Sequence, residues 1–296
     1  MAISSVKATV NGTSYTLTYN STTGAYEGTV TAPSKSSYAQ SGGYYGVTVT
    51  AYDDAGNSTT ADSADASFGD ALKLYVTEKT APTITVVNPS NDALLGSNKP
   101  TISWKCADSD SGVDKDSIKL YIDNVEVSGT ITASLSGSTY TCSYVPVSAL
   151  SDGKHTIKFA CADNDGNTST KSISLTIDTV PPTLNVAAPA EGLKTNMTTI
   201  TVSGTTNDMT SSPVTLTVNG TDVAVNSTGA FATTVGLSFG ENTITIVATD
   251  GVGKSTTISR KVYFNDIAPT IEEVSMVPNP VDAGKTFVIR VKVTDE

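Results

Sequence analysis

Residues 157–169, IKFACADNDGNTS, decide the fold. The apolar residues Ile157, Phe159 and Cys161 recur at every second position, with Lys158 and Ala160 between them. This two-residue period is typical of a half-buried β-strand. Asp163 then opens a turn that contains a glycine, and a run rich in Ser and Thr follows. The stretch therefore predicts a strand, a hairpin turn and a second strand.

This pattern occurs twice more, as VTVTAYDDAGNST at residues 47–59 and as ITIVATDGVGKST at residues 244–256. Each repeat is followed by another alternating strand and a proline linker, as in LYVTEKTAPT, LTIDTVPPT and VYFNDIAPT. Because proline fixes φ and lacks a donor, it ends one unit before the next begins. The repeats predict an incomplete domain at 1–80, complete domains at 81–180 and 181–266, and the start of a further domain at 267–296.

Composition favours an all-β chain and limits its partners. Aromatic residues make up 6% and charged residues 16% of the 296 residues, while Thr, Ser, Val and Gly dominate, as in short strands and turns. The net charge is −11 and the basic residues are scattered singly, so nucleic acid is not expected as a partner. No apolar run approaches the ~18 residues of a membrane span, so no direct membrane insertion is expected.

Two longer stretches point to a family. They are PTISWKCADSDSGVDKDSIKLYIDN from Pro100 and DGKHTIKFACADNDGNTS from Asp152, which look like the early strands and the late hairpin of one module. The chain resembles the bacterial immunoglobulin-like repeats. This resemblance implies tandem immunoglobulin-like β-sandwich domains in an extended rod, located extracellularly on a bacterial cell surface or a virion. Such modules occur as stalks, adhesins, virion decorations and enzyme appendages, so the fold does not choose a function.

The two ends of the chain match different parts of one module. Near the N-terminus Val6, Ala8 and Val10 align with Val214, Leu216 and Val218, and the matching strand of the middle module is Ile118, Leu120 and Ile122. That strand is the third of its module, because the linker strand and TISWKCAD precede it. Near the C-terminus residues 268–277 align with a linker strand, and the next strand aligns with residues 102–106. That last strand presents Phe287, Ile289, Val291 and Val293. The chain is interpreted as opening with a module that lacks two strands and closing with those two strands.

Three explanations of these ends remain open. The chain is a segment of a longer array, which is the usual context of such repeats. Alternatively, the tail strands complete the first module of another copy, giving a head-to-tail homo-oligomer or filament. In that arrangement Ile289, Val291 and Val293 pack on the strand near the N-terminus. Closure within one chain is disfavoured, because two whole modules separate the ends.

Catalytic and metal chemistry have few candidates. His155 is the only histidine, and no Ser-His-Asp or Cys-His set can be assembled, so the chain is predicted not to be an enzyme. The turns DSDSG and DNDGN place carboxylates two residues apart, as oxygen-rich Ca²⁺ loops do. Asp108, Asp110, Asp163 and Asp165 are therefore candidate calcium ligands. The favoured alternative is that these carboxylates only bond the backbone of their own hairpin turns. No other cofactor is expected.

The cysteines and tyrosines give two further candidates. The resemblance places Cys106 and Cys161 where immunoglobulin domains form their inter-sheet disulfide. The alternative is that all three cysteines are free, buried thiols, since the third cysteine, Cys142, would have no partner for a disulfide. Eight of the twelve tyrosines fall in residues 1–80, and a loop with Tyr38, Tyr44 and Tyr45 is a candidate for stacking on cell-surface carbohydrate. The alternative for these tyrosines is packing within the fold.

Two functions follow as hypotheses. The first is a structural protein: a subunit or segment of an extracellular bacterial filament or stalk, or of a phage tail fibre, assembled by strand donation. The second is a binding module, either a carbohydrate-binding adhesin or an accessory module of a larger secreted or virion protein.

Overall fold

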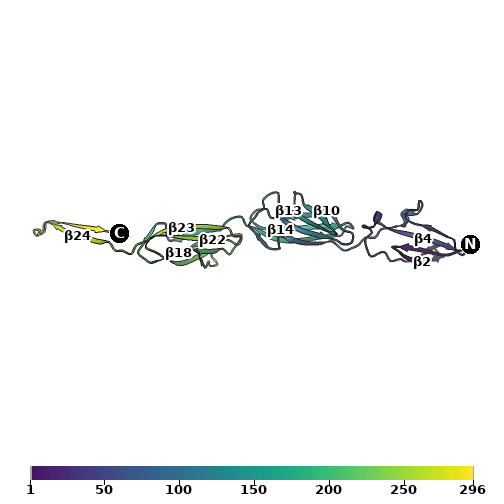
Figure 1. The fold of residues 1–296 in the computed structure, drawn as a ribbon, viewed down its shortest axis with the longest axis horizontal. Helices are drawn as coiled ribbons and strands as arrows, with labels where there is room; N and C mark the ends of the chain where they lie inside the picture. The colour runs from purple at the N-terminus through teal and green to yellow at the C-terminus, as the bar shows by residue number, and fades with distance from the viewer. Residues whose placement is uncertain (1, 296) are drawn as a thin grey trace. The chain divides into compact units, whose positions relative to one another are not determined.

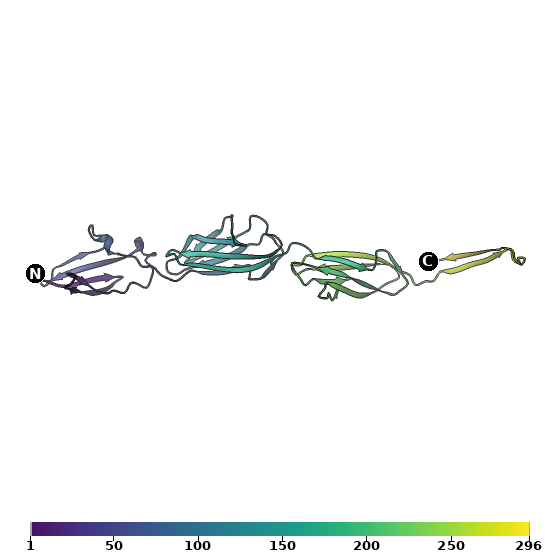
Figure 2. The same ribbon diagram turned by 180° about the vertical axis from the view of Figure 1, so that it is seen from behind.

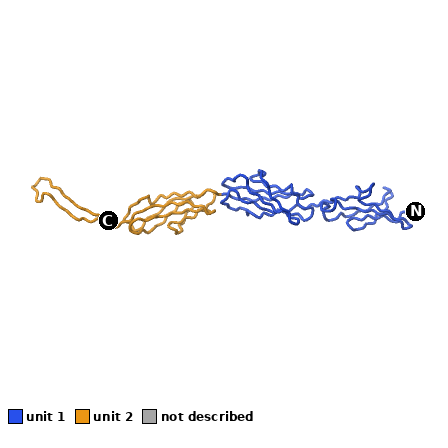
Figure 3. Tube along the Cα trace, turned by 45° about the horizontal axis from the view of Figure 1, so that its top comes forward, with its two compact units in different colours: residues 1–177 blue, residues 178–296 orange. Residues whose placement is uncertain are grey.

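The computed structural model describes residues 2–295, which form strands almost throughout. The chain divides into two compact units, residues 1–177 and residues 178–296, which have different colours in Figure 3. The helices of the described residues are single 3₁₀ turns, η1 (Ser41–Gly43) and η2 (Gly69–Leu72). No helix in residues 2–295 has the length and apolar character needed to cross a membrane.

The first unit contains a complete two-sheet sandwich, whose strands β10, β13 and β14 are labelled in Figure 1. One sheet has the order β11-β10-β14-β15-β8 and the other has the order β12-β13-β9-β7. The bounds are β7 (Thr83–Asn88), β8 (Ala93–Leu95), β9 (Ile102–Ala107), β10 (Val113–Ile122), β11 (Val125–Glu126), β12 (Thr132–Ser136), β13 (Thr139–Tyr144), β14 (Gly153–Asp163) and β15 (Thr168–Ile177).

Alternating residues from the two sheets make its core. On β9 the side chains of Ile102, Trp104 and Cys106 are fully buried, and β14 supplies Phe159 opposite them. The rings of Trp104 and Phe159 lie 5.2 Å apart between centroids. Such interdigitation of two inner faces is how aligned β-sandwiches are stabilised. The alternation that predicted the hairpin is therefore the pattern that fills this core.

The same unit also contains a single sheet near the N-terminus. Its order is β3-β2-β1-β4-β5, with β6 paired to β4. The bounds are β1 (Ile3–Val10), β2 (Thr13–Asn20), β3 (Ala25–Glu27), β4 (Tyr45–Asp53), β5 (Ser58–Ala61) and β6 (Lys73–Leu74). Among the described residues no second sheet belongs to residues 3–74. These residues thus form one sheet without a second sheet packed on it in the part of the chain that the structure describes.

The second unit contains another two-sheet sandwich, seen from both sides in Figures 1 and 2. Its sheets have the orders β16-β18-β21 and β17-β23-β22-β19-β20. The bounds are β16 (Thr183–Ala188), β17 (Leu193–Thr195), β18 (Thr199–Asn207), β19 (Thr215–Val218), β20 (Thr221–Val223), β21 (Ala230–Gly236), β22 (Gly240–Thr249) and β23 (Ser255–Phe264).

A two-stranded hairpin ends the described chain, with β24 (Thr270–Val277) antiparallel to β25 (Val288–Thr294). Its first pair joins Thr270 to Thr294, and a register shift follows near Ile271. The early hairpins of both sandwiches begin at the equivalent pairs, Thr83 with Ala107 and Thr183 with Asn207, and each also contains a register shift. The tail hairpin therefore shares the first two pairs of these hairpins, but its register shift comes two residues earlier, between Ile271 and Glu273, than the shifts that follow Val86 and Val186.

Candidate functional site

The late hairpin turn of each repeat is built around one aspartate. Asp163 Oδ1 accepts hydrogen bonds from the backbone N–H groups of Asp165 and Asn167, at 2.9 and 2.8 Å. Asp250 Oδ1 accepts from the N–H groups of Val252 and Lys254 at 2.9 and 2.8 Å. Asp53 Oδ1 holds the turn of the first repeat in the same way, by accepting from the N–H groups of Ala55 and Asn57. These bonds explain why Asp opens the turn, because its carboxylate replaces a missing backbone partner.

In the first unit this turn meets two other acids. The carboxylates of Glu78, Asp108 and Asp163 have oxygen atoms within 4.8 Å of one another, and all three side chains are buried. Glu78 follows β6, Asp108 follows β9 and Asp163 ends β14. Asp108 Oδ1 is held at 2.9 Å by the N–H groups of Asp110 and Gly112. Residues 78, 108 and 163 thus form one acidic site.

Two of the four predicted calcium ligands lie in this site, Asp108 and Asp163, and the other two do not. Asp110 Oδ1 accepts from the Ser36 N–H at 2.9 Å, and its other oxygen lies 3.7 Å from Lys35 Nζ. Asp165 Oδ2 accepts from the Glu78 N–H at 2.9 Å. Asp110 and Asp165 therefore hold the segment between β3 and β4 and the segment that follows β6, respectively.

Sequence reasoning missed Glu78 as the third member of the site. A signal was present, because the proline linkers LYVTEKTAPT and LTIDTVPPT carry an acid at the same distance before the final proline. That acid is Glu78 in the first linker and Asp178 in the second.

The second unit contains an equivalent site from Asp178, Asp208 and Asp250, again buried and with carboxylate oxygens within 4.8 Å of one another. Asp208 Oδ1 accepts from the N–H groups of Thr210 and Ser211, both at 2.8 Å. The Ser211 hydroxyl donates to Asp178 Oδ2. Asp250 Oδ2 is inaccessible to solvent and has no hydrogen-bond partner.

Charge repulsion is the main physical problem of both sites. Two unit charges ~4 Å apart repel by about 4 kcal/mol at an effective dielectric constant of ~20. Within residues 2–295, none of the six acids forms an ion pair with Lys, Arg or His. Burial and a hydrogen bond with Asp163 raise the pKa of Glu78. Burial opposes ionisation of Asp163 too, but hydrogen bonds from Asn167 and Glu78 lower its pKa.

The cysteines form a cluster of free thiols. Cys106, Cys142 and Cys161 are all buried and unbonded, so the disulfide between Cys106 and Cys161 is not present in the structure. The Cys106 side chain is in hydrogen-bonding contact with the other two. This contact and burial raise the pKa of Cys142 and Cys161, which keeps both as neutral thiols. They fill the core as small apolar side chains.

The three tyrosines of the candidate carbohydrate loop do not form one exposed platform. Tyr45 is buried, and its hydroxyl donates to Lys35 O at 3.3 Å. The ring of Tyr44 lies edge-on to Tyr75, with 6.2 Å between centroids. Only Tyr38 is exposed, beside a groove of about 380 Å³ that Tyr140 also lines. The packing alternative therefore holds for Tyr44 and Tyr45.

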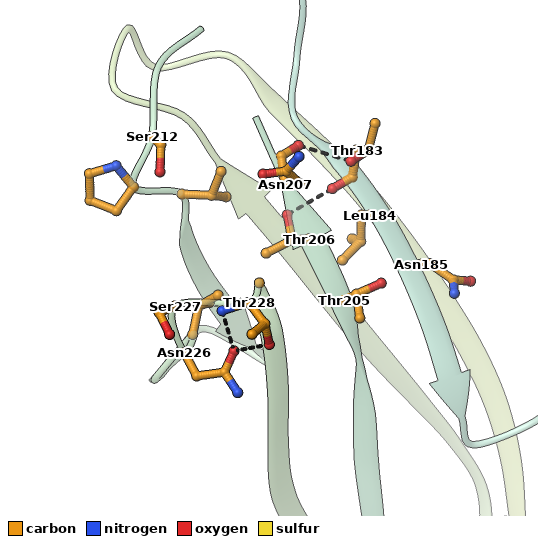
Figure 4. Close-up of a pocket in the computed structure, with 14 residues that line it drawn as sticks. Thr183, Leu184, Asn185, Thr205, Thr206, Asn207, Ser212, Asn226, Ser227 and Thr228 are labelled. Atoms are coloured by element: carbon orange, nitrogen blue, oxygen red, sulfur yellow. Dashed lines mark hydrogen bonds between the residues drawn. The ribbon is translucent and has the colours of Figure 1, made fainter. Parts of the chain in front are cut away.

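A larger hollow of about 630 Å³ lies in the second unit (Figure 4). Its lining is neutral, with Thr183, Asn207 and Asn226 among fourteen residues, and none of them is ionisable. Asn226 Oδ1 is occupied by the N–H and hydroxyl of Thr228, at 2.9 and 2.8 Å. General acid–base chemistry needs an ionisable group at this position, so the hollow is a poor candidate for catalysis.

The single histidine has a structural environment. His155 is buried, with Nδ1 at 2.6 Å from Asp123 Oδ2 and Nε2 at 2.8 Å from Ser151 O. Burial opposes its protonation, but the hydrogen bonds to Ser151 and Asp123 outweigh burial and raise the pKa of His155. With an acceptor at each nitrogen, the doubly protonated ring fits best.

This geometry predicts a pH-dependent contribution to the stability of the first unit. Because the folded pKa of His155 is raised, its stabilisation is complete below the unfolded value of about 6.5 and is lost as pH rises through the folded pKa. His155→Gln should lower the free energy of unfolding by about 1 kcal/mol at about pH 5.5, and by clearly less at about pH 9. Urea unfolding followed by Trp104, the only tryptophan, measures it. An equal difference at both pH values would contradict the charged pair.

Comparison with known proteins agrees with this architecture. Residues 82–158 match the family model described as Bacterial Ig domain, and residues 182–265 match the one described as Glucodextranase, domain B. No curated protein sequence matches the chain. An I-band fragment of titin is 13% identical, covers 88% of this chain and 87% of its own, and has a TM-score of 0.47. The fibronectin(III)-like modules of Clostridium thermocellum CbhA are 17% identical over 62% of this chain and 94% of theirs, with a TM-score of 0.36. The chain is thus built of tandem immunoglobulin-like β-sandwich modules, of which residues 82–158 match the bacterial Ig domain model.

Proposed function

We propose that this chain is a non-enzymatic structural protein of a bacterial cell surface or a virion, whose copies associate head to tail by strand complementation. In a filament, stalk or tail fibre of this kind, the hairpin β24–β25 of one copy becomes the first two strands of the N-terminal module of the next. The observation that carries the proposal is that the hairpin begins with the same two residue pairs as the early hairpins of both complete modules, Thr270 with Thr294 and Ile271 with Val293.

The hairpin presents apolar side chains that its counterparts bury. Ile289, Val291 and Val293 are 59, 51 and 52% exposed. In the first sandwich the equivalent residues Ile102, Trp104 and Cys106 are fully buried. Complete burial of one Val or Ile side chain is worth about 1.5–3 kcal/mol. Burial of these three side chains against a second copy would therefore stabilise the association of the two copies by several kcal/mol.

The N-terminal sheet has a free edge where the hairpin would add. In the second unit, β21 pairs with residues 199–205 of β18. Its counterpart β3 follows the same asparagine-centred turn, since Asn20 and Asn226 each accept an N–H two residues on at 2.9 Å. Among the described residues, however, β3 pairs only with β2. By this equivalence β25 would add to the free edge of β3, with Val291 opposite Tyr26.

The predicted acceptor residues impose one condition on this assembly. Val6, Ala8 and Val10 are only 8, 8 and 6% exposed, although no second sheet covers them. The incoming hairpin must therefore move aside the chain that shields them. Strand addition by exchange of a cover is favourable when the incoming strand buries more apolar area than it displaces.

Two measurements test the proposal. Sedimentation velocity over a concentration series should show polymers of the full chain, and only monomer after deletion of residues 267–296. The double variant Ile289→Asp/Val291→Asp should act like the deletion, while Val87→Asp, at another exposed valine, should not. In a second measurement, cysteines at Tyr26 and Val291 should form disulfides between copies, seen as oxidised ladders. The proposal fails if the full chain and the deletion variant sediment as the same monomer.

The second candidate is an accessory or adhesive binding module. It is favoured by the similarity of residues 182–265 to domain B of glucodextranase. The exposed Tyr38 beside its groove is the surface on which a sugar ring would stack. The sedimentation series discriminates between the two functions, because a chain that stays monomeric at every concentration leaves only this one.

A further inference from the structure

The cluster Asp178–Asp208–Asp250 has the properties of a metal site. We propose that it binds one divalent cation of the calcium type, and that Glu78–Asp108–Asp163 is a second site of the same construction. Each cluster brings together the acid of a linker, the acid that ends or follows the second strand, and the acid of the late hairpin turn.

Asp250 is the observation that separates this cluster from an ordinary group of surface acids. Its side chain is 6% exposed, and its Oδ1 is fully used by the turn. Its Oδ2 is inaccessible to solvent and has no donor within hydrogen-bond distance. A buried carboxylate oxygen without a partner is costly, and a cation held between the three acids is the group that would satisfy it.

The repeat explains why only the second cluster has this vacant oxygen. In the first unit, Asn167 Nδ2 donates to Asp163 Oδ2 at 2.7 Å. Lys254 occupies the equivalent position in the second unit, where only its backbone N–H reaches Asp250. A cation at the first site must share Asp163 with this amide. The second site is therefore expected to bind the cation more tightly.

The donor set selects the class of ion. All six cluster residues offer carboxylate oxygens, and the Ser211 hydroxyl adds a neutral oxygen beside Asp178. No His or Cys belongs to either cluster, so zinc and other metals that prefer nitrogen or sulfur are not favoured. Calcium accepts irregular oxygen sets, whereas magnesium demands near-octahedral geometry and keeps several waters. Buried sites with three carboxylates thus suit calcium better than magnesium.

Calcium titration of the chelator-treated full chain tests this inference by calorimetry and by thermal unfolding. Calcium should raise the unfolding midpoint by several degrees, and magnesium at the same concentration by less. Asp250→Asn, whose amide oxygen can still accept the turn bonds, should bind one calcium fewer per chain than the parent. Asp208→Asn should lose the same ion. Asp222→Asn, at an exposed acid of β20 outside the cluster, should bind as the parent does.

The second site is tested by Asp163→Asn, which should lose a different and weaker ion than Asp250→Asn. The inference is overturned if the parent binds no calcium at millimolar concentration, or if Asp250→Asn and Asp208→Asn both bind as many ions as the parent. Both readouts concern single modules, so they stand whether or not copies associate. Failure of strand complementation would leave the stoichiometry at these two clusters unchanged.

Discussion

Replacement of Gly204 by alanine is expected to destabilise the second sandwich by about 3 kcal/mol or more. Gly204 lies in the middle of β18, between β16 and β21. A Cβ at this position would stand 2.0 Å from Asn185 O and 2.8 Å from the ring of Phe231. The first contact is with backbone, which cannot turn away as a side chain does, so the sheet itself must shift. We therefore expect partial loss of the β16–β18 pairing.

Gly236→Ala is the matched control, because this glycine lies in the same sheet with nothing within 4 Å of its added Cβ. Hydrogen exchange of the β18 amides measures the effect in the second unit. Trp104 fluorescence reports the first unit alone and should not change. Equal protection in the Gly204 and Gly236 variants would show that the close approach of β16 and β18 is not required.

The alternation of apolar residues made the sandwich cores predictable from sequence. Ile157, Phe159 and Cys161 are buried on β14 as the two-residue period requires, because side-chain direction in a strand is a local property. The turn at Asp163 was predictable for the same reason, since a carboxylate and the two N–H groups that it accepts lie within four residues.

The acidic sites were only partly predictable, because they depend on contacts between distant residues. Spacing two apart in DSDSG and DNDGN paired Asp108 with Asp110 and Asp163 with Asp165. In a turn, however, the second of these acids donates its backbone N–H to the first and points elsewhere. The third acid of the first site, Glu78, is 30 and 85 positions away from Asp108 and Asp163, and only the fold brings it to them.

Burial of the tyrosines was likewise not readable from composition. Tyr44 and Tyr45 are neighbours in sequence, yet Tyr45 is buried at the start of β4 whereas Tyr44, just before the strand, is half-buried. Tyr38 belongs to no strand and is exposed. Several aromatic residues close together in a sequence therefore do not predict one exposed aromatic surface unless the strand boundaries are known.

Removal of divalent cations is expected to dissociate the head-to-tail polymers into monomers. If β25 completes the N-terminal module of a second copy, the repeat equivalence brings a third set of acids together. Asp295 takes the place of Asp108 and Asp208, and Asp53 of the next copy takes the place of Asp163 and Asp250. Asp53 Oδ1 already holds the same turn as those two residues. A cation shared between Asp295 and Asp53 would then lie across the junction of two copies.

Sedimentation with calcium and with chelator measures this dependence. Asp53→Asn and Asp295→Asn should each weaken association in calcium at least tenfold, as loss of about 1.4 kcal/mol would do. Asp54→Asn, at the neighbouring exposed acid of the same turn, should leave it unchanged. If polymers persist in chelator, yet are lost when residues 267–296 are deleted, strand pairing alone holds the copies together and the junction binds no cation. If Asp54→Asn weakens association as much as Asp53→Asn, the effect is one of overall charge, because only Asp53 has the position that the two buried clusters use.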